Sequence, residues 1–103
     1  MPEPVPLVDA MRRIRTWPWS EDQQSAHIDM LIEAVLIDLY PSPEWIISVD
    51  HDSRTIHVAH WKRIVSGETE MWSYIPGSVR DISCVELESA GEGWLALAQS
   101  QMP

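Results

Sequence analysis

The sequence predicts an α+β fold in which one or two N-terminal helices pack on an antiparallel sheet of four to five strands, arranged as a meander. Before Pro41, apolar residues recur at helical spacing. After it, apolar and polar residues alternate in short runs, separated by turn residues such as Gly, Pro, Ser and Asp. With 103 residues, of which 45% are hydrophobic, the chain is long and apolar enough to fold as one domain over 1–103.

Prolines predict an extended, flexible start over 1–6, because proline fixes φ and lacks a backbone N–H. A first helix is expected over 7–15, where three apolar residues share one face: Leu7, Met11 and Ile14. Pro18 ends this helix, because the residue before a proline is pushed out of the α region.

A second, longer helix is expected over 21–39. Ser20 and Gln23 have the spacing of a capping box, in which each residue satisfies a backbone N–H of the other. Pro41 and Pro43 end the helix. Residues 7–39 are therefore expected to be helical.

The faces of this second helix are unusual. Projected at about 100° per residue, three acids form one narrow stripe: Asp22, Asp29 and Glu33. The opposite face is apolar, and it continues into a second apolar flank of Met30, Ala34 and Ile37. This apolar arc is wider than a single neighbour, here the predicted sheet, can cover. The helix therefore needs a second neighbour, which is either the first helix or another protein chain.

The rest of the chain, 44–98, is expected to be mainly β. Period-two alternation and β-branched residues predict strands at 45–50, 55–65, 69–75 and 79–88. The turn signals between the first three of these predict two consecutive hairpins. Residues 94–98 fit a fifth strand or a short helix equally well.

Charge is distributed unevenly, and the formal net charge is −9. Residues 21–52 contain eight acids and no Lys or Arg, and six more acids follow from Glu68 onward. Such a surface repels nucleic acid and anionic membranes, and it attracts basic protein surfaces. Tryptophan is abundant, with six residues, and is enriched in interfaces. We expect the acidic stripe to bind a partner together with these C-terminal residues: Glu68, Glu70, Asp81, Glu86, Glu88, Glu92 and Trp72.

Catalytic motifs are absent from the sequence, which has no nucleophile elbow, phosphate-binding loop or zinc-protease pattern. We expect neither enzymatic activity nor a cofactor. His51, His57 and His60 leave a metal-dependent enzyme as an alternative, although residues three apart on a strand point to opposite faces. Cys84, the single cysteine, is expected to fill the core.

The favoured hypothesis is a small acidic, non-enzymatic inhibitor that blocks a basic, nucleic-acid-handling protein such as a nuclease, an effector complex or a toxin. Anti-CRISPR proteins, toxin-immunity proteins and DNA mimics have this size and charge. We expect neither direct contact with nucleic acid nor contact with a membrane. We expect a cytoplasmic location. The alternative is an assembly module that self-associates, for example as a homodimer, through Met30, Ala34 and Ile37 of helix 21–39.

Overall fold

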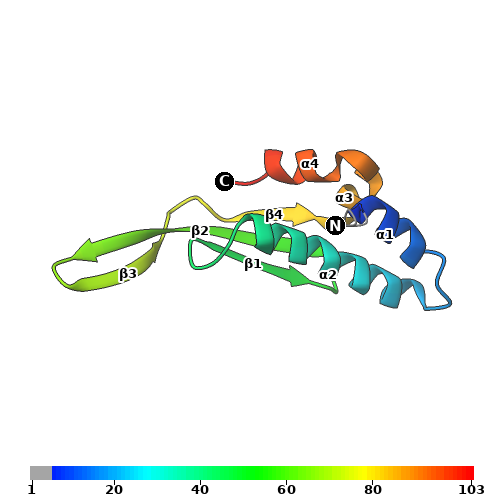
Figure 1. Cartoon of the computed structure of the whole chain (residues 1–103), viewed down its shortest axis with the longest axis horizontal. Coiled ribbons are helices and arrows are strands. Elements are labelled where there is room, and N and C mark those ends of the chain that lie inside the picture. Colours follow the sequence, from blue (N-terminus) through cyan, green and yellow to red (C-terminus); the bar gives the residue numbers. More distant parts are fainter. Residues whose placement is uncertain (1–5) are drawn as a thin grey trace, which may run out of the picture.

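A computed structural model describes residues 6–103 and has the predicted α+β fold (Figure 1). The expected flexible start over 1–6 lies outside the described residues, apart from Pro6. The elements follow one another in this order: α1 (Leu7–Ile14), α2 (Glu21–Leu39), β1 (Trp45–Asp50), β2 (Thr55–Ser66), β3 (Thr69–Tyr74), β4 (Arg80–Ser83), α3 (Cys84–Ala90), η1 (Gly91–Gly93) and α4 (Trp94–Ser100).

Helix α2 begins at the predicted capping box. The Ser20 hydroxyl accepts a hydrogen bond from the Gln23 N–H, and the Gln23 side chain accepts one from the Ser20 N–H, both at 3.2 Å. Two N–H groups that have no partner within the helix are thereby satisfied.

Replacing Ser20 by alanine is expected to lower the free energy of unfolding by about 1 kcal/mol, because the cap is lost while the helix remains. Urea denaturation measures this change. Ser48→Ala, at an exposed position on β1, is the control and should stay within about 0.5 kcal/mol of the wild type. Equal losses in the two variants would contradict a stabilising role for the cap.

Strand β2 is the centre of a four-stranded antiparallel sheet. Its first half pairs with β1 on one edge and with β4 on the other, and its second half pairs with β3. The chain therefore returns to β2 after β3, instead of adding β4 outside β3 as a simple meander would. The Ser78 hydroxyl bridges this return by donating to the His60 carbonyl at 2.9 Å and accepting from the His60 N–H at 3.2 Å.

The C-terminal part is helical from Cys84 onward. Strand β4 ends at Ser83, whose side chain caps α3 by accepting from the Glu86 N–H at 3.3 Å. The prediction of a strand over 79–88 is therefore wrong beyond Ser83. For residues 94–98, where strand and helix were both open, the structure has a helix, because they belong to α4. Within 44–98, the four strands come first and the short helices follow from Cys84 onward.

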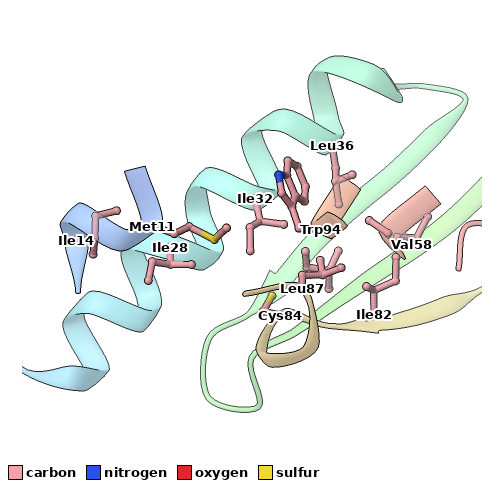
Figure 2. Close-up of a cluster of buried hydrophobic side chains, with 12 residues drawn as sticks. Met11, Ile14, Ile28, Ile32, Leu36, Val58, Ile82, Cys84, Leu87 and Trp94 are labelled. Carbon is pink, nitrogen blue, oxygen red and sulfur yellow. The ribbon is translucent and has the colours of Figure 1, made fainter. Parts of the chain in front are cut away.

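The helices cover one face of the sheet. On α2, Ile28, Ile32 and Leu36 are fully buried, and they pack in one cluster with Val58 of β2 and Trp94 of α4 (Figure 2). Along β1, alternate residues face this core, while Ile46 on the opposite face is 46% exposed. Residues 6–103 therefore leave one side of the sheet uncovered, as antiparallel sheets allow. Among residues 6–103, no helix combines the length and the apolar character needed to cross a membrane.

Candidate functional site

The predicted acidic stripe is interrupted at its middle residue. Asp29 is completely buried, and its carboxylate accepts from the guanidinium of Arg54, with Nη2–Oδ1 at 2.9 Å and Nε–Oδ2 at 3.1 Å. Arg54 also donates to Glu88 at 3.0 Å, and Glu88 accepts from Arg15 at 2.7 and 2.8 Å. We call Arg15, Asp29, Arg54 and Glu88 the ion-pair network. It joins the end of α1, α2, the β1–β2 turn and α3, so Asp29 and Glu88 serve the fold.

The network shifts the pKa values of Arg15, Arg54 and Glu88 toward their charged forms. Hydrogen bonds from Arg15 and Arg54 hold the pKa of Glu88 below its ordinary value of 4.5, against the opposing effect of burial. The hydrogen bond to Asp29 raises the pKa of Arg54. Both shifts mean that folding favours the charged pair.

Acidification is expected to destabilise the protein through Glu88. A carboxyl group whose pKa is lower in the folded state stabilises the fold above its unfolded pKa, and this contribution disappears as the pH falls through the folded pKa. Chemical denaturation at several values between about pH 3 and 5 should show stability falling toward the acid side. In Glu88→Gln the slope of stability against pH should be shallower, and an unchanged slope would contradict the assignment to Glu88.

Three more of the predicted acids are hydrogen-bonded within the fold. Glu33 accepts from the Val49 N–H at 2.8 Å, which covers part of the outer edge of β1. Asp81 pairs with His57 at 2.7 Å on the uncovered sheet face. Glu70 pairs with Arg63 at 2.8 Å.

The remaining predicted acids are exposed but do not form one surface. Asp22 lies near the start of α2, and Glu68 lies in the turn between β2 and β3. Glu86 and Glu92 belong to α3 and η1, away from that turn (Figure 1). The structure therefore does not gather the predicted acids into a continuous row.

The histidines and the cysteine are placed separately. His57 lies on the uncovered sheet face, whereas His60 lies on the opposite face, stacked on Trp45 with ring centroids 4.0 Å apart. In the described part of the chain, no three His, Cys, Asp or Glu side chains are close enough to hold a metal ion. Cys84 is buried in the core as expected, and burial together with the Asp29 carboxylate raises the pKa of its thiol to about 12.

The second apolar flank of α2 is exposed in this chain. Met30 is 53% exposed, Ile37 is 43% exposed, and Ala34 lies between them on the surface. Self-association through these three residues stays a prediction.

A surface that the sequence did not single out as a unit is the hairpin of β2 and β3. The segment Trp61–Ser66 of β2 pairs with Thr69–Tyr74 of β3 and extends beyond the helices, at the left of Figure 1. We call this hairpin the arm. No fully buried core residue belongs to it. It contributes to a radius of gyration of 15.9 Å, above the value of about 13 Å typical of a compact domain of this length.

The register of the arm places its aromatic residues on one side. Trp61 lies opposite Tyr74, and Arg63 lies opposite Trp72. Cross-strand partners share a face, and a strand repeats every two residues, so these four side chains lie together. We call them the aromatic face. Trp61 and Tyr74 contact edge to face, with ring centroids 6.1 Å apart.

The arm exposes several apolar side chains, and its strand edges are open. Val65 is 60% exposed, Met71 55% and Tyr74 40%. The pairing of β1 with β2 stops at Trp45 and His60, so beyond that point no described strand lies on that edge of the arm. The Trp61 indole N–H is buried and has no hydrogen-bond partner among the described residues. Such an arm is suited to contact with another protein.

A tight turn closes the arm. Gly67 has φ +61° at the first position of the two-residue connection between Ser66 and Thr69, the position that a type II′ hairpin turn reserves for glycine. Three of the predicted partner-binding residues lie on the arm or its turn: Glu68, Glu70 and Trp72. The sequence signal for the whole arm was the length of the β-branched and aromatic run over 55–65.

No protein-family model, curated protein or solved structure matches the chain.

Proposed function

We propose that this protein is a small, non-enzymatic binding protein that attaches to a basic surface of a partner protein through the aromatic face of its arm. The observation that carries the proposal is the position of the arm outside the core. A hairpin that buries no core residue adds exposed apolar area and open strand edges, which usually mark an interaction site or an aggregation hazard.

Residue type supports a protein partner. Trp, Tyr and Arg are the residues most enriched among those that dominate binding energy at interfaces, and the aromatic face consists of these three types. The net charge of −9 supports a basic partner, because long-range attraction raises the rate of encounter. Internal ion pairs do not change this net charge.

A partner that handles nucleic acid presents a surface of this kind, since it must attract phosphates. Covering that surface would inhibit the partner, which is the role of anti-CRISPR and toxin-immunity proteins. Under this proposal the arm replaces the predicted acidic residues as the main contact. The net negative charge increases the rate at which the basic partner meets the protein.

Affinity capture from the cells that produce the protein tests this function. Wild type is compared with Trp72→Ala and Tyr74→Ala, and with the control Val85→Ala, which removes a 49% exposed apolar side chain from α3. A specific partner should be recovered about tenfold less with each arm variant and equally with the control. Its recovery by wild type should also fall as salt is raised from about 0.1 to 0.5 M. Equal recovery by all four proteins would refute the proposal.

A further inference from the structure

A groove of about 680 Å³ lies between the start of α1, the second half of α2 and the first residue of α4. Leu7, Leu31 and Val35 line it together with Trp94. A second hollow of about 320 Å³ is also lined by Leu7 and Trp94, so the two lie next to each other. The lining is mostly apolar, and the groove lies apart from the arm.

The charged residues of this groove are all acidic. Asp38 lines the larger hollow, and Asp9 and Glu92 line the smaller one. No Lys or Arg among the described residues lines either hollow. Arg12 approaches Asp9 at 3.7 Å, but both side chains are largely exposed, so this pair neutralises the groove weakly.

We infer that this groove docks a cationic amphipathic helix of a partner protein. Apolar side chains of that helix would enter between Leu7 and Val35, and its Lys or Arg residues would face Asp38, Asp9 and Glu92. The part of α2 that lines the groove, 31–39, is about 12 Å long, which matches anchors at positions i, i+4 and i+7 of a docked helix. This site is additional to the arm and does not depend on it.

A second copy of the chain fits the groove less well. It carries the same net charge of −9, and its α2 contains no Lys or Arg to face the acids. Like charges across an interface oppose association, whereas a cationic helix gains from them.

The test uses a fluorescent Leu/Lys peptide of about four helical turns, with leucines at helical spacing, in an anisotropy titration against the full chain. A scrambled peptide of equal composition and a Leu/Glu peptide of equal pattern are the peptide controls. We expect the patterned Leu/Lys peptide to bind at least about tenfold more tightly than either. Amide signals of 31–39 should shift in NMR spectra when it binds.

Groove variants locate the binding. Ala34→Trp fills the groove from an exposed helical position, and Ala96→Trp places the same side chain on α4 outside it. Binding should weaken about tenfold or more in the first variant and stay unchanged in the second. Asp38→Asn should weaken binding about two- to fivefold, while Asp22→Asn, on the same helix, should not. Circular dichroism checks that each variant is folded. If Ala34→Trp does not fold, the comparison of Asp38→Asn with Asp22→Asn decides.

Three results would overturn the inference. The first is peptide binding that survives both Ala34→Trp and Asp38→Asn, which would mean nonspecific attraction to an acidic protein. The second is a dimer in analytical ultracentrifugation that Ala34→Trp converts to a monomer, which would assign the groove to a second copy. The third is binding that appears only after residues 1–5 are deleted, which would assign it to this chain's own start.

Discussion

Replacing Asp29 by alanine is expected to lower the free energy of unfolding by about 3–5 kcal/mol, because removing one partner of a buried ion pair leaves the other charge uncompensated. Asp29 is completely buried and Arg54 is only 17% exposed, so water can replace little of what the guanidinium loses. Urea denaturation followed by circular dichroism measures the change.

Two comparisons make this expectation specific. Asp22→Ala removes an exposed acid from the same helix and should change stability by no more than about 0.5 kcal/mol. The double replacement of Asp29 and Arg54 by leucine should recover much of the loss, since a buried pair exchanged for apolar residues is often neutral. If Asp29→Ala costs no more than Asp22→Ala, the network is not what holds these elements together.

Replacing Ile32 by alanine is expected to cost about 2–5 kcal/mol, because a fully buried side chain leaves a cavity that the surrounding elements cannot close. Leu31 is the matched comparison. It is adjacent in sequence but only partly buried, because it lines the groove between α1 and α2. Its replacement by alanine should cost less, about 1 kcal/mol. Equal losses at the two positions would show that α2 is rotated from the orientation described.

Helix α2 and the hairpin of β1 and β2 could be predicted from the sequence because their signals are local. Ser20, Gln23 and Pro41 mark the ends of α2 through interactions within a few residues of each end, so its bounds were predicted as found. Alternation along 45–50 and 55–65 gave the pairing of β1 with β2 for the same reason. The start of α3 also had a local signal, because Ser83 and Glu86 have capping-box spacing. The β-branched Ile82 and Val85 around them favoured a strand instead.

The structural role of Asp29 and Glu88 could not be predicted from the sequence, because it depends on contacts between residues far apart in the chain. Asp29 meets an arginine 25 residues later in the chain, and Glu88 meets Arg15 across 73 residues. Helical projection correctly places Asp29 on the same face of α2 as Asp22 and Glu33. It cannot show that an arginine from the β1–β2 turn packs against that face. Arg54 does so from a left-handed conformation, with φ +52°. An acidic stripe on a helix therefore identifies a polar face without showing whether solvent or a buried arginine lies against it.

The single strand β2 serves both the core and the arm, which gives its backbone two levels of protection from solvent. Around Ile56 and Val58 its amides lie between two neighbouring strands beneath buried side chains, so their hydrogen exchange requires opening of the core. Around Val65 they have one neighbouring strand and a largely exposed side chain, so opening there costs far less. A partner that clamps the arm would slow exchange at the outer end of the strand while the inner end, already slow, changes little.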